Sequence, residues 1–201
     1  AQVPVTIDPS LRLISDTAQF SAQLQKHNAS IGSENFPVIG LVPFSNTLSV
    51  PRMSDLAAHI SAHWINEGDA KQRRVLHSSL IASNIEHELH KFIAGELIIS
   101  ASDRIDVLLA SSLASSNGIP LAGLVLTEHH QPNEHVLNFC QTAIKQGLPI
   151  IHTPLSTFET AQELANLSNE IPVDDTERAE QVTRFVSSHL NPEWITQLIN
   201  G

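Results

Sequence analysis

From residue 75 onward, short apolar runs alternate with longer stretches in which apolar residues recur every three or four positions. The runs that begin near residues 75, 96, 121 and 148 have the length and almost wholly apolar character of buried strands. The stretches between them have helical spacing, and they end at Gly95, Gly118 and Gly147, as helices often end at glycine. This alternation predicts an α/β fold: a largely parallel sheet with helices on both faces, built from successive βα units.

The chain before residue 75 is less regular. Residues 1–35 are mostly polar or small, and we expect a flexible flank or linker with one helical pattern at 16–27. Residues 36–50 contain "FPVIGLVPF", which reads as a short apolar strand interrupted by Pro43. A helix is predicted after Pro51 because apolar residues follow at helical spacing: Met53, Leu56, Ala57, Ile60 and Trp64.

Polar residues predict where the later helices begin. Ser83, three residues before Glu86, has the spacing of a capping box, and the helix after it, over about 84–93, is expected to bury the stripe Ile85, Leu89, Phe92 and Ile93. Asp103 is placed to cap the next helix, with Asp106 in its first turn. Further helices are predicted at 132–146, at 156–168, from Asp174 to about 190 and from Asn191 onward. In the 132–146 helix one face is expected to enter the core, namely Val136, Phe139, Cys140 and Ala143.

Composition narrows the classes of function. The net charge of −10 and the low aromatic content of 4% argue against nucleic-acid binding, which needs a positive surface and stacking platforms. No apolar run is long enough for a membrane span, and the start "AQVPVTIDPS" lacks the pattern of a signal peptide. A single cysteine, Cys140, excludes an intrachain disulfide, and we expect a cytoplasmic protein.

The motifs of several enzyme classes are missing. The chain contains no phosphate-binding G-x-x-x-x-G-K-[ST] or G-x-G-x-x-G, no H-E-x-x-H and no G-x-S-x-G. The pairs His59/His63 and His87/His90 lie off the apolar stripes, and a loop cluster at 129–135 has no fixed ligand spacing. We therefore expect solvated histidines, no metal and no cofactor, with a small metal-dependent enzyme as a weaker alternative.

Ligands of open parallel sheets bind beyond the carboxyl ends of the strands. The residues expected at that edge are tentative ligand-binding candidates: Ser83, Ser102, Asp103, Arg104, Thr127, His129 and His152. Capping accounts for the two acids of "SASDRID" but not for Arg104, a cation at the positive end of a helix. Its partner would be an effector or a neighbouring subunit, and it would face Thr127. At the opposite edge, Arg73 and Arg74 indicate an anion or inter-domain contact, or merely a solvated turn.

Several segments together resemble a known family: "VIGLVPF", "INEGDAKQRRV", "AGELIISASDRIDVLLASSLASSNGIPLAGLVLT", "GLPIIHT" and "IPVDDTERAEQVTRFVSSHLNPEWI". In order and spacing they are similar, over about residues 36–200, to the middle region of long bacterial phosphate acetyltransferases, the DRTGG domain. The resemblance places the DR pair on Asp103 and Arg104 and the threonine on Thr127. The two glycines of the motif would fall at 128 and 129, where this chain has Glu128 and His129.

The resemblance implies a domain layout and a function. Residues 36–50 would be the residual last strand of a preceding P-loop-like domain, 51–190 the DRTGG-like domain, and 191–201 a helix leading to a catalytic domain that is not present. The family interconverts acetyl-CoA plus phosphate and acetyl phosphate plus CoA. The fragment itself is then expected to be a non-catalytic, metabolite-sensing domain. A nicotinamide nucleotide, a pyruvate-type acid or ATP would be its effector. Its protein partners would be other domains and subunits of the same homo-oligomeric enzyme. The alternative is a structural oligomerisation or interaction module that binds no metabolite.

Overall fold

The computed structural model describes residues 50–168 and 170–190, with single positions at 22–24, 26, 40, 42, 43, 45, 48, 192 and 196. The helix expected at 16–27, the strand at 36–44 and the final helix from 191 therefore lie largely outside the described residues. By its internal contacts the chain divides into two compact units, Ser49–Pro172 and Ala1–Leu48 with Val173–Gly201. The domain boundaries expected from the sequence stay a prediction.

The larger unit is built on a five-stranded sheet in the order β1-β5-β4-β3-β2. The strands are β1 His63–Asn66, β2 His77–Leu80, β3 Glu96–Ala101, β4 Gly123–Thr127 and β5 Ile150–His152. β2, β3, β4 and β5 are parallel, and β1 pairs antiparallel with β5. The predicted α/β fold is confirmed, with all four predicted strands present and parallel.

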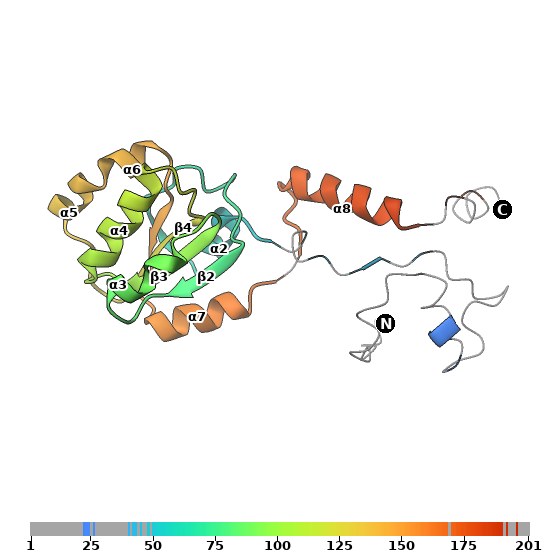
Figure 1. Ribbon diagram of the computed structural model, residues 1–201, viewed down its shortest axis with the longest axis horizontal. Helices are drawn as coiled ribbons and strands as arrows, with labels where there is room; N and C mark the ends of the chain where they lie inside the picture. Colours follow the sequence, from blue (N-terminus) through green and yellow to red (C-terminus); the bar gives the residue numbers. More distant parts are fainter. Residues whose placement is uncertain are drawn as a thin grey trace. The chain divides into compact units, whose positions relative to one another are not determined.

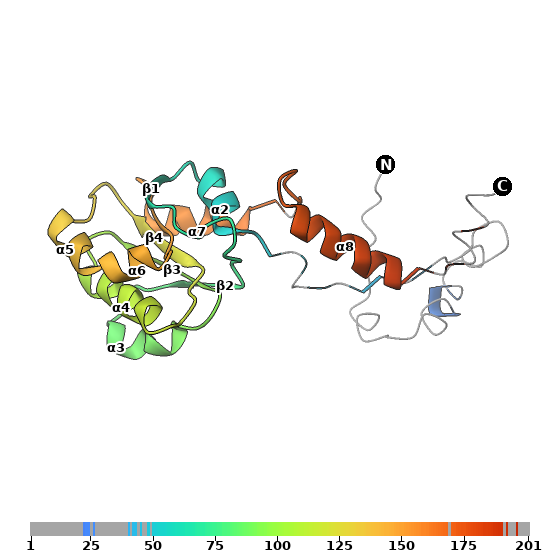
Figure 2. The same cartoon turned by 90° about the horizontal axis from the view of Figure 1, so that it is seen from above.

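Helices cover both faces of this sheet (Figures 1 and 2). One face carries α3 Ile85–Glu88, the 3-10 helix η3 Leu89–Lys91, α4 Ile105–Ser116, α5 Glu134–Phe139 and α6 Gln141–Lys145. The other carries α2 Met53–His59 and α7 Thr157–Ala165. Because β4 is buried on both sides, its alternate residues belong to two separate hydrophobic cores. Leu124 and Leu126 pack under α4, and Val125 packs under α2.

The helix predicted from Met53 to Trp64 is shorter than expected. It ends at His59 because Ser61 takes a left-handed backbone, φ 48°, and the Ala62 amide turns back to the Ala57 carbonyl at 2.9 Å. This is a Schellman-type end, which usually places glycine where Ser61 stands. Trp64, the fifth residue of the apparent stripe, lies instead in β1 and is 39% exposed. Without a glycine, the sequence carried no stop signal.

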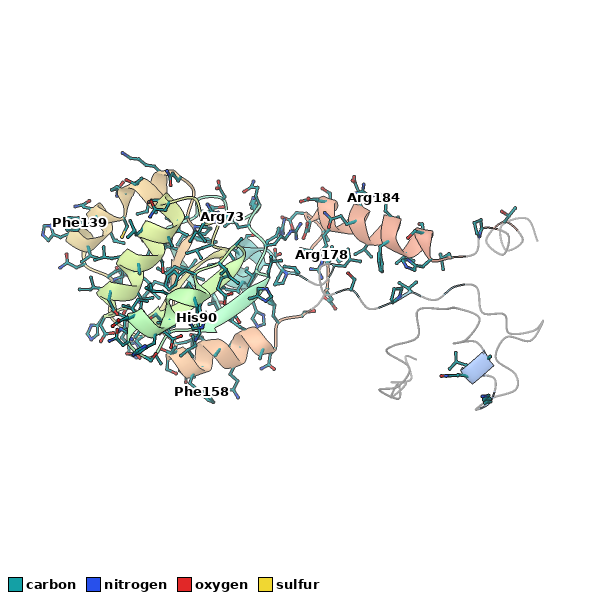
Figure 3. All side chains as sticks on the ribbon, viewed as in Figure 1. Arg73, His90, Phe139, Phe158, Arg178 and Arg184 are labelled. Carbon is teal, nitrogen blue, oxygen red and sulfur yellow. The ribbon has the colours of Figure 1, made fainter. Side chains whose placement is uncertain are left out.

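The helices at 84–93 and 132–146 also depart from the prediction. The first is one turn of α3 followed by η3, and of its expected stripe Phe92 is buried while Leu89 and Ile93 are exposed. The second divides at Cys140 into α5 and α6. Cys140 and Ala143 enter the core as expected, but Phe139 is 80% exposed and points away from the domain (Figure 3).

Two predicted caps in the larger unit are displaced by one residue. Asn84, not Ser83, accepts a hydrogen bond from the Glu86 amide and caps α3. Arg104, not Asp103, occupies the cap position of α4. In each case neighbouring polar residues compete for one position, and the exact turn geometry decides which of them caps the helix.

The smaller unit contains α8, Thr176–Ser188, which Asp175 rather than Asp174 caps by accepting from the Arg178 amide at 3.2 Å. Arg178 is 4% exposed, and its Nε donates to the Leu48 carbonyl at 2.7 Å. An antiparallel bridge joins Gly40 to Leu190. Within the described part of the chain, no helix combines the length and apolar character that crossing a membrane requires.

Candidate functional site

The carboxyl ends of the four parallel strands meet at one edge of the sheet, as their common direction requires. Backbone hydrogen bonds continue beyond the strands and hold the loops together there. The Ser102 amide donates to the Thr127 carbonyl at 3.0 Å, and the Thr153 amide donates to the Leu126 carbonyl at 2.9 Å. The sequence-derived candidates after β2, β3, β4 and β5 therefore lie along a shared edge, which is the usual ligand position of such sheets.

Arg104 joins two of these loops. Its guanidinium forms two parallel hydrogen bonds with Asp106, Nε to Oδ1 at 2.9 Å and Nη2 to Oδ2 at 2.7 Å. The same group donates to the carbonyls of Ala82 at 3.3 Å and Ser83 at 2.8 Å, in the loop after β2. Four of its five N–H groups are thus engaged, and the side chain fastens that loop to the start of α4. The partners of Arg104 are therefore Asp106 and the carbonyls of Ala82 and Ser83, and not Thr127 as the sequence suggested.

The Arg104–Asp106 pair holds both groups in their charged forms. Hydrogen bonding and charge from Arg104 lower the pKa of the Asp106 carboxyl. The same hydrogen bonds to Asp106, with smaller charge effects from Asp106 and Asp103, raise the pKa of Arg104. Sequence reasoning noticed Asp106 only as a first-turn acid. The signal for its second role was an opposite charge two residues from an arginine at a helix start, which is too common a pattern to be decisive.

Thr127 connects two strands and a helix on the face of the sheet that carries α2 and α7. Its side chain is fully buried, and its hydroxyl donates to the Ser100 carbonyl at 3.3 Å. The Thr157 hydroxyl, in the first residue of α7, lies 2.8 Å from the Thr127 hydroxyl oxygen. Because the Thr127 proton is already donated to Ser100, the Thr157 hydroxyl is the donor of this second bond. Thr127 therefore connects β3, β4 and the start of α7. Thr157 was not among the sequence-derived candidates, because nothing in its local sequence distinguishes it.

Glu128, where the resemblance places the first glycine of the motif, has a left-handed backbone with φ 75°. Both of its backbone groups are engaged: the amide donates to the Leu155 carbonyl at 2.8 Å, and the carbonyl accepts from His152 Nε2 at 2.8 Å. The turn geometry that favours glycine is thus present although a glutamate occupies it. His129, at the second glycine position, does not have a positive φ.

The His152 ring is held in one tautomer by this contact. Because a carbonyl only accepts, Nε2 carries the proton in the neutral ring, and Nδ1 is left as an acceptor. His152 is 5% exposed, and its Nδ1 has no hydrogen-bond partner among the described residues. It is the one candidate at this edge with a buried, unmet hydrogen-bonding atom, since Ser102 and Thr127 are absent from that set.

The remaining edge candidates are more open. Asp103 and His129 are exposed, and the Asp103 carboxylate makes no hydrogen bond within the described structure. His129 contributes to lowering the pKa of Glu159, whose hydrogen bonds with Ser156 are the larger cause. Ser83 is also exposed and donates to Glu88, which pairs with Lys91 at 2.5 Å. The edge thus presents acids, imidazoles and hydroxyls to solvent, while its arginine is largely occupied.

Arg73 lies at the opposite edge, where the parallel strands begin (Figure 3). Its guanidinium donates to the Leu121 carbonyl at 2.7 Å and to the Gln146 carbonyl at 3.3 Å, and it lies 3.4 Å from Asp69. These bonds fasten the chain before β2 to the start of β4 and the end of α6. Arg74 forms an antiparallel backbone bridge with Arg52. A role of either arginine in binding an anion or another domain stays a prediction.

Reactive groups of other kinds are scarce in the described residues. Cys140 is 1% exposed, and burial raises the pKa of its thiol, so the nucleophilic thiolate is disfavoured. His59, His63, His87 and His90 are exposed, as the sequence predicted. Over the described ranges, no group of three or more His, Cys, Asp or Glu side chains is arranged to hold a metal ion.

Comparison with known proteins identifies the family of the domain that contains this edge. The family model of the DRTGG domain matches residues 55–167, which include all five strands. The chain belongs to the DRTGG domain family. The residues expected at the aspartate, arginine, threonine and first glycine positions of the motif lie at the carboxyl edge of the sheet: Asp103, Arg104, Thr127 and Glu128.

The relatives of this DRTGG chain are proteins named phosphate acetyltransferase. It is 68% identical to that of Acinetobacter baylyi, with 100% of the chain matching 28% of that protein. For Pseudomonas putida the identity is 38%, over 90% of the chain and 26% of the relative, and for Escherichia coli it is 39%, over 83% and 23%. The chain therefore spans about a quarter of the length of these relatives, and the resemblance to their DRTGG region is confirmed.

One solved structure with a DRTGG domain is also similar. It is the crystal structure of the CBS and DRTGG domains of the regulatory region of Clostridium perfringens pyrophosphatase, complexed with the activator diadenosine tetraphosphate. The match has a TM-score of 0.47 and 14% identity, and it covers 83% of each chain. A likeness of this extent carries no functional argument for the present DRTGG domain.

Proposed function

We propose that this chain is a non-catalytic regulatory domain of a phosphate acetyltransferase, in which the carboxyl edge of the sheet senses a metabolite. The observation that carries the proposal is the match of the entire chain to about a quarter of a protein of that name, at 68% identity. The DRTGG assignment supports it, and so does the buried thiol of Cys140, which is unsuited to nucleophilic catalysis. Acetyl transfer would then belong to another part of the enzyme.

The chemistry of the edge favours one class of effector. Arg104 has one N–H left, so a carboxylate such as pyruvate could use it fully only by breaking the contacts with Asp106 or the β2 loop. Asp103, by contrast, is an exposed acceptor, and the Nδ1 of His152 is a buried one. Carboxylates in α/β sheets recognise ribose hydroxyls at the equivalent edge. A ribose-bearing effector, such as a nicotinamide nucleotide or ATP, therefore fits better than a small acid.

Titration calorimetry of the chain with NADH, ATP, pyruvate and phosphoenolpyruvate tests this proposal. We expect heat with at least one ribose-bearing compound, and a loss of about tenfold or more in its affinity for Asp103→Asn. Glu67→Gln is the matched control because Glu67 is an exposed acid beyond the end of β1, at the opposite edge. Absence of binding by all four compounds would remove the sensing role, and equal binding by both variants would move the site away from this edge.

The alternative function, a structural module that binds no metabolite, is favoured by one observation. The loops at the carboxyl edge are already fastened to one another by Arg104 and Thr127, as a purely architectural role requires. In the full-length enzyme, Arg104→Ala would distinguish the two functions. If the response to effectors survives while the size of the oligomer changes, the structural function is the correct one.

A further inference from the structure

The helix α4 has an inverted distribution of side chains around its axis. Its buried side includes Val107 and Leu108, but the other buried positions are small serines: Ser111, Ser112 and Ser115. Its outer side carries large apolar residues at i, i+4 and i+8, here called the α4 stripe: Ile105, Leu109 and Leu113. They are 47%, 38% and 64% exposed, respectively. A helix that served only the core of its own domain would have its large apolar residues on the inner side.

Almost no charge accompanies the α4 stripe. Asp106 is the one charged residue of α4, and its carboxylate is already paired with Arg104, Oδ2 to Nη2 at 2.7 Å. The helix α7, which covers the other face of the sheet, is different: it exposes Glu159, Gln162 and Glu163, as surface helices normally do. The outer side of α4 therefore has the composition of a covered surface, not of one that faces solvent.

Further apolar residues are exposed on the same face of the sheet, where α3, η3 and α5 lie with α4 (Figure 2). Leu89 in η3 and Ile93 just after it are 56% and 48% exposed, and Phe139 at the end of α5 is exposed as well. Exposed apolar groups that gather on one face usually mark a surface that another protein covers.

The chemistry of the α4 stripe limits what would cover it. An uncharged stripe offers nothing to the phosphates of a nucleic acid or a lipid headgroup, and the net charge of −10 repels such anions and a second copy alike. An apolar protein surface is the occupant that fits. The chain matches 28% of the Acinetobacter baylyi relative, so most of a protein of that kind lies outside these 201 residues. A surface on the same polypeptide needs little intrinsic affinity, because tethering gives it an effective concentration of about millimolar.

We propose that the α4 stripe is the docking surface for another part of the same polypeptide. An apolar surface from outside these 201 residues, such as one face of an amphipathic helix, would lie along Ile105, Leu109 and Leu113 and cover them. Because α4 begins at the carboxyl edge of the sheet, the docked part would contact the helix that Arg104 ties to that edge. The inference rests on the proposed membership of a longer phosphate acetyltransferase, but not on metabolite sensing.

Cysteine labelling in the present chain and in the full-length enzyme tests the docking. Leu113→Cys places a thiol on the α4 stripe, whereas the natural Cys140 is buried. The rate of its reaction with a maleimide is followed by mass spectrometry of the labelled peptide. We expect that rate to be about tenfold or more lower in the full-length enzyme, since only molecules with an uncovered stripe react. Gln162→Cys, exposed on α7, is the matched control and should react similarly in both proteins.

A second substitution on the stripe should reverse the protection. Leu109→Lys, added to Leu113→Cys, should restore labelling in the full-length enzyme, because an apolar partner would have to bury its charge. Leu109→Gln makes the same test without a charge, and Gln162→Lys should leave the protection intact. Circular dichroism of the present chain shows which variants are folded.

Several outcomes would overturn the docking. One is equal labelling of Leu113→Cys in the two proteins, and another is protection that persists in the folded Leu109 variants. Equal protection of Gln162→Cys would show that the covering is not specific to α4. Protection that appears in the present chain at high concentration, or that dilution of the full-length enzyme removes, would assign the stripe to contacts between molecules. The absence of effector binding in calorimetry would remove metabolite sensing alone and would leave these results unchanged.

Discussion

At the scale of single residues, the side chains of the DRTGG motif act first on the loops around them. Arg104 fastens the loop after β2 to α4, and Thr127 fastens β4 to α7. Each bridges segments that are distant in the sequence, which is why local pattern reasoning singled out these positions without finding their partners. A binding role for this edge then depends on Asp103 and His152, whose acceptors remain available.

Removal of the Arg104 side chain should lower stability. We expect Arg104→Ala to reduce the free energy of unfolding by about 1 to 2 kcal/mol, since it breaks a paired charge and two bonds to carbonyls at a site that is only partly screened by solvent. Urea unfolding measures the change. Lys145→Ala, an exposed cation on α6, is the control and should stay within about 0.5 kcal/mol of the wild type. Equal effects of the two substitutions would contradict the fastening role.

The lowered pKa of Asp106 has a consequence for acid stability. A carboxyl whose pKa is lower in the folded state contributes stability above its unfolded pKa and loses it as the pH falls through the folded value. The contribution of Asp106 should therefore be complete at neutral pH, begin to fall near the unfolded pKa of about 4, and be lost as the pH falls further through the lower pKa of the folded state. Comparing the unfolding midpoints of the wild type and Asp106→Asn at pH 7 and pH 3 should show a difference at pH 7 that shrinks at pH 3. A difference of the same size at both values would refute the assignment.

Glu128 offers a test of backbone geometry that is independent of charge. Glycine usually destabilises relative to alanine, but at a positive φ the Cβ is the strained group. Glu128→Gly should therefore be more stable than Glu128→Ala by about 1 kcal/mol. The reverse order in thermal or urea unfolding would show that the left-handed turn is not maintained in solution.

At the scale of elements, the sequence predicted the helices and strands that depend on the periodicity of apolar residues. It failed where the local backbone geometry decides how an element ends or which side chains it buries. β3, β4 and β5 were found because apolar runs buried on both faces leave a clear pattern, whereas β2 is mostly exposed and was found from the apolar residues on either side of it. The strand β1 was missed because Trp64 continued a helical spacing after a Schellman-type end made without glycine. Leu89 and Ile93 have the spacing of a core stripe, yet η3 turns them outward. The edge of the sheet was placed correctly by topology, whereas the bonds of Arg104 to two carbonyls depend on loop positions that no pattern encodes.

The start of α7 gives a prediction for one element. Ser156 and Glu159 form a reciprocal capping box: the Glu159 amide donates to the Ser156 hydroxyl at 3.2 Å, and the Ser156 amide donates to the Glu159 carboxylate at 2.9 Å. Ser156→Ala should lower the free energy of unfolding by about 1 kcal/mol. Ser116→Ala, inside the last turn of α4, is the comparison and should have a smaller effect. An unchanged unfolding midpoint for Ser156→Ala would mean that the cap is redundant.

At the scale of the whole chain, the larger unit has the features of an autonomous domain. Ser49–Pro172 contains the entire sheet and both core clusters, and the DRTGG match at 55–167 lies wholly inside it. We expect a fragment of residues 49–172 to fold alone and to unfold cooperatively within a few degrees of the corresponding transition in the 201-residue chain. Calorimetry of the two proteins makes the comparison. A fragment without a cooperative transition would show that residues outside the unit are needed for folding.

The buried position of Cys140 has a practical consequence. It is the only cysteine of the chain, it is 1% exposed, and burial raises the pKa of its thiol, so maleimides and similar reagents should react with it slowly. The natural sequence therefore behaves towards these reagents almost as a cysteine-free background. A fluorophore or spin label could be attached at one introduced cysteine, for example through Ser78→Cys at an exposed position of β2, without first replacing a core residue. The signal of that label would then report on a single known position in an otherwise unaltered protein.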